Sequence, residues 1–367
     1  MRILQLGKFY PIRGGVEKVM WNLMKGLSGQ GIPCDMLCAR LKEEKTEHVR
    51  VNKDGEMFCV KALAKVAATM ISPEMVLWLR KRASAYDIIH VHHPDPMAAL
   101  ALRLSGFRGK VILHWHSDIL SQRALLALYR PLQSWLVRRA DAIIGTTPVY
   151  LQESAALREV QDKCVAVPIG IPELVVDKAS AEAFRQRYPG KVILLSVGRL
   201  VPYKGYPVLI EALKQLPEEY HLVIGGMGPL ENALKAQVAD AGLERRVSFL
   251  GYLPEEDLPA YFGACDIFVL SSCMKTEAFG IVQVEAMSCG KPVVATKIPG
   301  SGVSWVNADG VSGKNALPDN PSSLARAILE VGGNREEYGR GARERYLRLF
   351  TEDQMIKSII GIYEKFL

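Results

Sequence analysis

Two glutamates with seven residues between them, Glu277 and Glu285, are the strongest chemical feature of the sequence. If Glu277 lies at the start of a helix, eight steps of about 100° place Glu285 roughly 80° away on nearly the same face. One carboxylate can then bind a sugar and the other a ribose. The alternative for Glu285, which lies among apolar residues, is a buried salt bridge.

Two cations follow the first predicted strand of the second half of the chain. Arg199 and Lys204 lie five residues apart in VGRLVPYKG, just before a helix expected to begin near Tyr206. Fixed cations at the carboxyl end of a strand suit a diphosphate and neutralise the charge that develops when a nucleoside diphosphate leaves. The alternative is a pair of solvated surface charges.

Glycines precede helices at two further strand ends. Gly14 and Gly15 come directly before a helix from Val16, whose first N–H groups can face an anion. Gly226, in GGMGPLENAL, can let a phosphate or a nucleotide ring approach the backbone. A plain turn explains both sites equally well. The first turn lacks GxGxxG, which counts against a nicotinamide dehydrogenase.

Five histidines gather at the ends of two predicted strands: His90, His92, His93, His114 and His116. Imidazoles on adjacent strands can bind zinc, and a zinc-dependent hydrolase is the rival interpretation from another class. HWHSD matches only part of a metallohydrolase motif, because Ile119 stands where a histidine is needed. We therefore expect polar residues at the mouth of a cleft, with no metal and no other cofactor.

The length and the order of elements predict two domains. A chain of 367 residues exceeds the size of one ordinary core. Short apolar runs alternate with helical patterns in both halves, which predicts two α/β domains with parallel sheets. Pro168, Gly170 and Pro172 place the linker near residues 168–175, and ligands should bind at the carboxyl ends of the strands.

Composition and charge limit the location and the partners. Seven cysteines without a CxxC pair, and no apolar run of about 18 residues, favour a cytoplasmic protein that is neither exported nor membrane-spanning. Residues 1–168 carry 24 Lys and Arg against 15 Asp and Glu, a balance of +9, and the remainder 22 against 24, a balance of −2. We expect the basic half to face an anionic membrane or lipid phosphate and not nucleic acid, because aromatic platforms are missing. A non-catalytic lipid-phosphate binding protein is a third interpretation.

In order and spacing, GGVE, HSD at His116–Asp118, GRLVPYKG, GGMGPL and Glu-x7-Glu resemble glycosyltransferase family 4. The resemblance implies a GT-B fold, an α/β architecture of two Rossmann-like parallel-sheet domains facing each other across a cleft. Residues 1–168 would bind the acceptor and 169–349 the nucleotide-sugar, with a helix at about 350–367 crossing back onto the first domain. HWHSDI, Tyr129-Arg130-Pro131 and GTTPVYLQES are similar to bacterial O-antigen and capsule enzymes, several of them mannosyltransferases.

The resemblance also implies roles for particular residues. The donor diphosphate would bind Arg199, Lys204 and the loop of Gly14 and Gly15, with Gly226 nearby, and the ribose would bind Glu285. Glu277 and the backbone of Phe279, Gly280 and Ile281 would hold the donor sugar, with His116 near its reacting face. The residues expected to bind the acceptor are Asp118, Arg123 and His93.

The expected enzyme is a retaining, metal-independent hexosyltransferase of lipopolysaccharide or capsule biosynthesis, at the inner face of the cell membrane. Its expected donor is GDP-mannose, with a UDP-sugar as the alternative, and its acceptor is a saccharide or a polyprenyl-diphosphate-linked saccharide. The absence of a DxD triplet agrees with metal independence. No second carboxylate is placed as a nucleophile, so we expect front-face attack in which the acceptor hydroxyl gives its proton to the departing phosphate.

Overall fold

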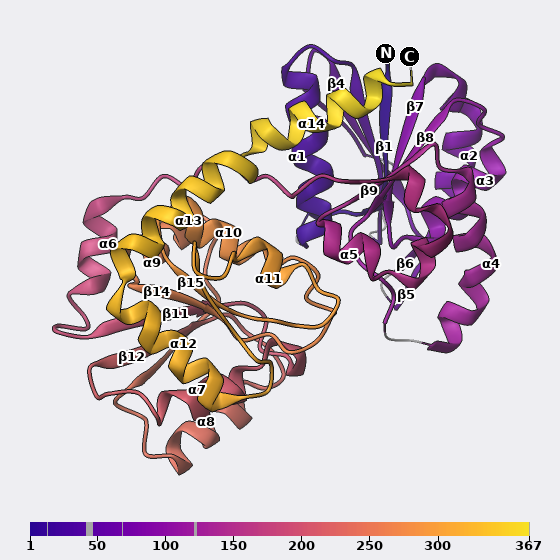
Figure 1. Cartoon of the computed structure of the whole chain (residues 1–367). Helices are drawn as coiled ribbons and strands as arrows, with labels where there is room; N and C mark the ends of the chain where they lie inside the picture. The colour runs from indigo at the N-terminus through magenta and orange to yellow at the C-terminus, as the bar shows by residue number, and fades with distance from the viewer. Residues whose placement is uncertain (13, 42–46, 68, 121–122, 367) are drawn as a thin grey trace. The chain divides into compact units, whose positions relative to one another are not determined.

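The computed structural model describes residues 1–12, 14–41, 47–67, 69–120 and 123–366, without the side chains of residues 123 and 124. It contains two compact units (Figure 1): residues 1–169 with 352–367, and residues 170–351. Each unit is built on its own sheet, as the α/β class predicts. In the described ranges, no helix is both long enough and apolar enough to cross a membrane.

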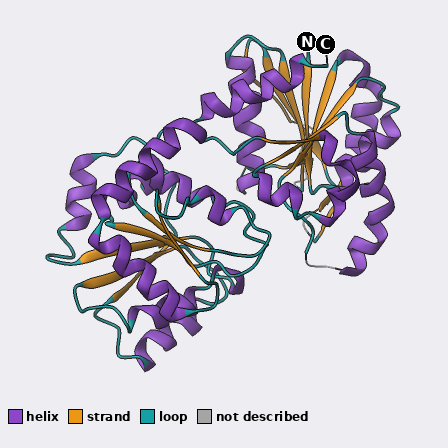
Figure 2. Cartoon of the chain, in the orientation of Figure 1, coloured by secondary structure: helices purple, strands orange, loops and turns teal. Residues whose placement is uncertain are grey.

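The first unit has an eight-stranded sheet. Its strands, in spatial order, are β10 (Cys164–Ala166), β9 (Ala142–Gly145), β8 (Lys110–Trp115), β7 (Ile88–His93), β1 (Ile3–Phe9), β2 (Cys34–Arg40), β4 (Gly55–Lys61) and β3 (Glu47–Asn52). Neighbouring strands are parallel except β3 and β4, which are antiparallel. Figure 2 shows helices flanking the strands. This cover explains why nearly all residues of the central strands β8, β7, β1 and β2 are buried.

Helices and short elements complete the first unit. They are α1 (Gly15–Gly29), α2 (Pro73–Arg82), η1 (Ala83–Ala85), α3 (Pro96–Ser105), α4 (Arg123–Arg139), α5 (Pro148–Gln152), η2 (Ala155–Lys163), α14 (Glu352–Glu364) and the hairpin of β5 (Ala64–Val66) and β6 (Thr69–Ile71). Three helices begin with a polar cap followed by proline, the usual N-terminal signal. In α3, Asp95 Oδ1 accepts from the N–H groups of Met97 and Ala98 at 3.0 and 3.1 Å.

The second unit has a six-stranded, wholly parallel sheet. Its order is β13 (Val247–Gly251), β12 (Tyr220–Gly225), β11 (Val192–Val197), β14 (Ile267–Leu270), β15 (Val293–Thr296) and β16 (Gly313–Ala316). Its helices are α6 (Lys178–Arg185), η3 (Pro202–Lys204), α7 (Tyr206–Leu213), α8 (Glu231–Asp240), α9 (Leu258–Ala264), α10 (Ile281–Ser288), α11 (Val303–Val306), α12 (Pro321–Gly333) and α13 (Arg335–Leu349).

The last helix, α14, packs against α1 in the first unit. Gly26 of α1 permits the close approach, because a Cβ atom there would lie 2.0 Å from Ile356 Cδ1. Farther along α14, Tyr363 is fully buried and its hydroxyl reaches Gln5 on β1. Residues from the end of the chain therefore belong to the core of the first unit.

Candidate active site

Three loops at the carboxyl ends of β11, β12 and β14 carry most of the predicted donor residues of the second unit. They are residues 198–205, 226–230 and 271–280. The carboxyl ends of adjacent parallel strands meet at one edge of a sheet, where ligands bind in such folds.

Glycine allows the first two loops to touch. Gly226 has φ 129°, and a Cβ atom there would lie 2.0 Å from the carbonyl oxygen of Gly198. The N–H of Leu200 donates to the carbonyl of Met227 at 3.0 Å, which joins the same loops. A side chain at position 226 would push them apart. Gly226 therefore has a packing role in addition to its predicted role in donor binding.

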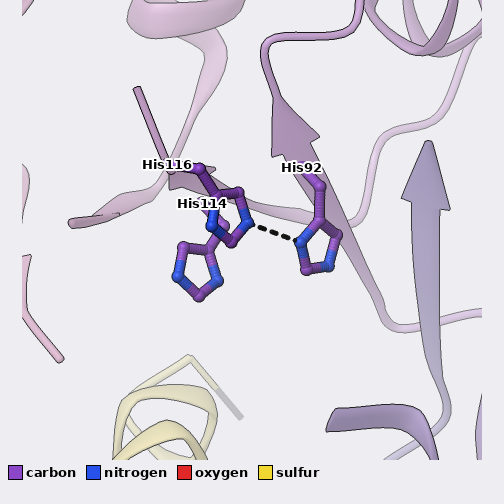
Figure 3. Close-up of side chains that lie close together, drawn as sticks. All are labelled: His92, His114 and His116. Carbon is purple, nitrogen blue, oxygen red and sulfur yellow. Dashed lines mark hydrogen bonds between the residues drawn. The ribbon is translucent and has the colours of Figure 1, made fainter. Parts of the chain in front are cut away.

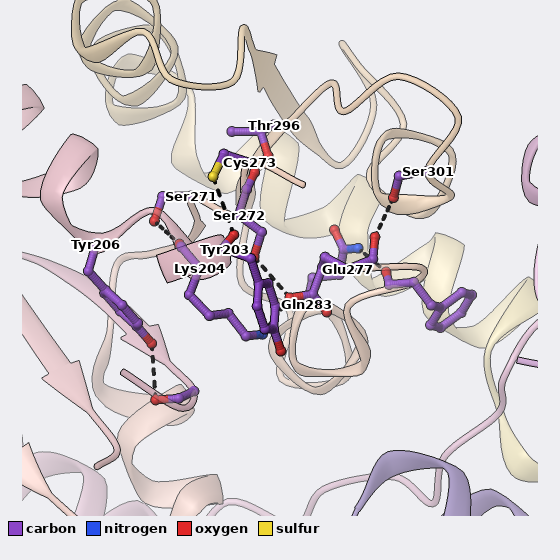
Figure 4. A network of polar contacts seen from close by, with 12 residues as sticks. Tyr203, Lys204, Tyr206, Ser271, Ser272, Cys273, Glu277, Gln283, Thr296 and Ser301 are labelled. Atoms are coloured by element: carbon purple, nitrogen blue, oxygen red, sulfur yellow. Dashed lines mark hydrogen bonds and ion pairs between the residues drawn. The ribbon is translucent and has the colours of Figure 1, made fainter. Parts of the chain in front are cut away.

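A second glycine joins the loop of Lys204 to the loop of Glu277. Gly205 has φ 67°, and a Cβ atom there would lie 2.0 Å from the carbonyl oxygen of Ser271. Ser271 Oγ donates to the carbonyl of Lys204 at 2.9 Å, and the N–H of Cys273 donates to the carbonyl of Tyr203 at 2.8 Å. Figure 4 shows the hydrogen bond of Ser271 to Lys204 and a contact of Cys273 Sγ with the carbonyl of Tyr203. They bring the lysine and the glutamate side by side.

Lys204 and Glu277 form an ion pair at this edge, with Lys204 Nζ 2.5 Å from Glu277 Oε2. Their side chains are only 11% and 12% exposed. Ser272 Oγ donates to the same carboxylate oxygen at 2.9 Å, and Ser301 Oγ donates to the backbone carbonyl of Glu277 (Figure 4). For Lys204, the alternative of a solvated surface charge is wrong. Arg199 is exposed, at the start of the same loop.

The predicted helical relation between the two glutamates is wrong. Helix α10 begins at Ile281, and Gly280 precedes it with φ 73°. Glu277 lies in the loop before the helix, so the angle of about 80° between the two side chains does not apply. Glu285 lies in the second turn of α10 and is half-buried. The backbone at Phe279, Gly280 and Ile281 leads into the helix N-terminus, whose first N–H groups have no intrahelical acceptor.

In the first unit, Gly14 and Gly15 start helix α1, with Gly14 extended as its N-cap residue. A Cβ atom on Gly14 would lie 2.0 Å from Glu17 Oε2, so the buried carboxylate of Glu17 lies against the first turn. A negative charge is favourable at a helix N-terminus. This position, predicted for a donor phosphate, is thus next to an anionic side chain of the chain itself.

The five histidines are buried, so the expectation that they line the mouth of a cleft is wrong. His92, His114 and His116 form a stack in which the ring centroids of His114 and His116 are 4.0 Å apart (Figure 3). Burial lowers the pKa of all five, and that of His114 to about 3. The imidazoles are therefore neutral at neutral pH.

The stack has poor geometry for a metal ion. Among the described residues, His92, His114 and His116 are the group whose ligand atoms lie within 4.8 Å of one another. Their ring planes are 11° to 24° from parallel, and lone pairs in stacked, nearly parallel rings do not converge on one ion. In addition, His92 Nδ1 is already bonded to His116 Nε2 at 2.9 Å. This geometry disfavours the zinc-hydrolase interpretation.

The residues predicted to bind the acceptor all lie in the first unit, and His93 and Asp118 have different hydrogen-bond partners there. His93 stacks on Trp115 with centroids 3.6 Å apart, and its Nε2 lies 3.1 Å from Gln133 Nε2. Asp118 Oδ1 accepts from Trp115 Nε1 at 3.0 Å and from Ser154 Oγ at 2.6 Å. Arg123 begins α4, and its side chain lies outside the described part of the chain.

Lys8 is a potential functional residue that the sequence reasoning missed. It is 7% exposed and has φ 60°, which is uncommon for a residue with a side chain. Its Nζ donates to the carbonyl of Pro94 and its backbone N–H to Asp95 Oδ2, both at 2.5 Å. A lysine at the carboxyl end of the first strand was the available signal.

Two Rossmann-like units with parallel sheets define a GT-B fold, and solved structures agree. The Anabaena HepE protein in complex with UDP has a TM-score of 0.81 at 22% identity, with both chains fully covered. Sucrose-phosphate synthase from Thermosynechococcus elongatus has a TM-score of 0.79 at 22% identity, covering 100% of this chain and 99% of the other.

Sequence comparison identifies the family. Residues 13–173 match the model described as Glycosyltransferase Family 4, and residues 177–345 match that of the glycosyl transferases group 1. O-antigen chain mannosyltransferase C of Escherichia coli is 31% identical over 99% of this chain and 98% of its own. The D-rhamnosyltransferase WbpZ of Pseudomonas aeruginosa is 33% identical over 96% and 92%. The chain belongs to glycosyltransferase family 4 and is a glycosyltransferase.

The buried histidines predict a stability that depends on pH. In the unfolded chain the pKa of an imidazole is about 6.5, which is above the lowered pKa values in the folded protein. As the pH falls, the unfolded state therefore binds protons before the folded state does. The free energy of unfolding should be highest above about pH 6.5 and should decrease as the pH drops toward the pKa values of the folded state. We expect the thermal midpoint to fall between about pH 7 and about pH 5. His114→Phe should flatten this dependence in thermal scans across pH, and an equally steep or steeper dependence would contradict the account.

Proposed function

We propose that this glycosyltransferase transfers a hexose, with mannose from GDP-mannose as the first candidate, in the biosynthesis of a bacterial surface polysaccharide such as O-antigen or capsule. The name of the Escherichia coli relative, an O-antigen chain mannosyltransferase, supports both the mannosyl donor and the O-antigen product, whereas the Pseudomonas aeruginosa relative is named a D-rhamnosyltransferase. The acceptor is a growing saccharide or one linked to polyprenyl diphosphate. A UDP-sugar is the alternative donor, and the HepE structure with UDP favours testing it.

The ion pair of Lys204 and Glu277 is the observation that carries the proposal. A lysine 11% exposed at the carboxyl edge of a parallel sheet is a fixed cation for a diphosphate, and exposed Arg199 on the same loop supplies a second. Glu277, once separated from Lys204, can accept hydrogen bonds from sugar hydroxyls. Glu285, half-buried on α10, binds the ribose.

The proposed reaction is retaining and needs no metal. Lys204, Arg199 and the N-terminus of α10 stabilise the charge on the leaving diphosphate, the task that a divalent ion performs elsewhere. The bond between the anomeric carbon and the phosphate oxygen breaks, and the acceptor oxygen bonds to the same face of that carbon. The acceptor proton passes to the departing phosphate oxygen. His116 assists at the reacting end of the donor sugar.

A panel of nucleotides tests this proposal. GDP, UDP, ADP and their sugar conjugates are added to the purified protein with and without EDTA, and thermal unfolding is recorded. We expect one nucleoside diphosphate to raise the midpoint with EDTA present, because ligands that bind the folded state stabilise it. Glu285→Ala should weaken the effect, whereas Glu211→Ala, on a half-exposed surface glutamate of the same unit, should not.

Two outcomes would refute parts of the proposal. If none of the nucleotides stabilises the protein, the proposed donor site is wrong. If sugar transfer stops when EDTA is added, the proposed metal independence is wrong. If NMR shows a product of inverted anomeric configuration, the proposed retention is wrong.

We also propose that the first unit contacts an anionic membrane surface. Leu63 is 71% exposed beside the β5–β6 hairpin, and Leu77 is 58% exposed on α2. Lys65 lies on the same hairpin, and Arg80 and Lys81 lie in the last turn of α2. Exposed apolar side chains that are close in sequence to basic ones suit the interface of anionic lipids.

Sedimentation with vesicles tests the membrane contact. Vesicles containing phosphatidylglycerol should bind the protein, and Leu63→Asp with Leu77→Asp should weaken binding several-fold. Vesicles of phosphatidylcholine alone serve as the control. Equal binding to both vesicle types, or no effect of the substitutions, would contradict the proposal.

A further inference from the structure

A chain of hydrogen bonds connects the last helix of the protein to His116. Tyr363 Oη on α14 lies 3.2 Å from Gln5 Nε2 on β1, and Gln5 Oε1 lies 2.8 Å from His92 Nε2 on β7. His92 Nδ1 then lies 2.9 Å from His116 Nε2, the contact drawn in Figure 3. All four side chains are buried, so water does not compete for these contacts. We refer to these four residues as the relay.

The surroundings of Gln5 fix the orientation of its amide. In the observed orientation, the amide nitrogen can donate to Tyr363 Oη and to Cys34 Sγ at 3.6 Å, while the amide oxygen accepts from His92. The reversed amide would place its oxygen between these two partners and leave one N–H without an acceptor. An unsatisfied buried donor costs free energy. Tyr363 Oη, which accepts from Gln5, also lies 2.5 Å from His90 Nδ1.

The amide orientation determines the protonation of both relay histidines. Because burial lowers the pKa of His92 and His116, each is neutral and carries one ring proton. Gln5 Oε1 is an acceptor, so the proton of His92 is on Nε2 and its Nδ1 is an acceptor. His116 must then donate from Nε2. Its own Nδ1 carries a lone pair and has no hydrogen-bond partner among the described residues.

We propose that Gln5 and Tyr363 are positioning residues, which act through His92 to hold His116 in the Nε2–H tautomer with Nδ1 available to accept a hydrogen bond. This inference rests on the proposed function only where it gives His116 a part in transfer. An imidazole of this tautomer can accept from a hydroxyl group at Nδ1 and cannot donate there. The end of the chain, 358 residues from Gln5, would thereby tune a residue of the HSD motif.

Nitrogen NMR of the protein labelled with ¹⁵N-histidine tests the relay without an activity assay. Protonated and bare ring nitrogens have well-separated shifts, and the His116 signals are identified by their loss in His116→Gln. In the wild-type protein we expect a protonated Nε2 and a bare Nδ1. Tyr363→Phe and Gln5→Met should shift His116 toward a mixture of tautomers. Tyr86→Phe, which removes a buried hydroxyl bonded to Asp35 outside the relay, should leave the spectrum unchanged.

Kinetics supply a second measurement. A histidine in the wrong tautomer loses much of its catalytic effect, so we expect Tyr363→Phe and Gln5→Met to lower kcat about tenfold with little change in the donor KM. A wild-type His116 protonated on Nδ1, or a His116 spectrum unaffected by both substitutions, would overturn the inference. If His116→Ala keeps full activity, the role proposed for His116 fails, while the NMR result on the relay still stands by itself.

Discussion

The ion pair between Lys204 and Glu277 is the interaction on which the candidate donor site depends. Two charges with about a tenth of their side-chain surface exposed are stable only as partners, since removing either leaves a costly unpaired charge. The surrounding architecture serves this pairing. Gly205 permits contact with the backbone of Ser271, and Ser301 holds the carbonyl of Glu277. The wholly parallel sheet places both loops at one edge.

Both units place a carboxylate of the chain where family resemblance expects part of the donor. In the second unit, Glu277 forms an ion pair with Lys204, the residue that a diphosphate would bind. In the first unit, Glu17 lies against the first turn of α1, where a phosphate is expected. A diphosphate bound as proposed would compete with Glu277 for Lys204, which would exchange one anionic partner for another. In the proposed site, such an exchange would free Glu277 for the sugar and would link binding of the phosphates to recognition of the hexose.

The sequence predicted the elements better than the contacts. Apolar runs such as those of β11 and β14 identify buried parallel strands, and the α/β class with a GT-B fold is confirmed. The helical relation of Glu277 to Glu285 failed because Gly280, in a left-handed conformation, delays the helix start. The histidines were expected at the mouth of a cleft, and their burial was missed although their neighbours in the strands are apolar. The contact between Gln5 and Tyr363 joins distant segments and cannot be predicted from one sequence. The antiparallel edge strand β3 also had no clear signal.

Calorimetric titration of GDP and GDP-mannose, or of the pair that stabilises the protein, tests the central claim most directly. It is performed on the wild type, on Glu277→Gln and on the surface control Glu211→Gln. The account predicts that Glu277→Gln binds the free diphosphate at least as tightly as the wild type, because Lys204 is released. The affinity of Glu277→Gln for the sugar conjugate should decrease about tenfold or more, which is the effect of losing one hydrogen bond to a charged group. The account would be contradicted if Glu277→Gln bound the free diphosphate more weakly than the wild type while the difference in affinity between the sugar conjugate and the free diphosphate stayed the same.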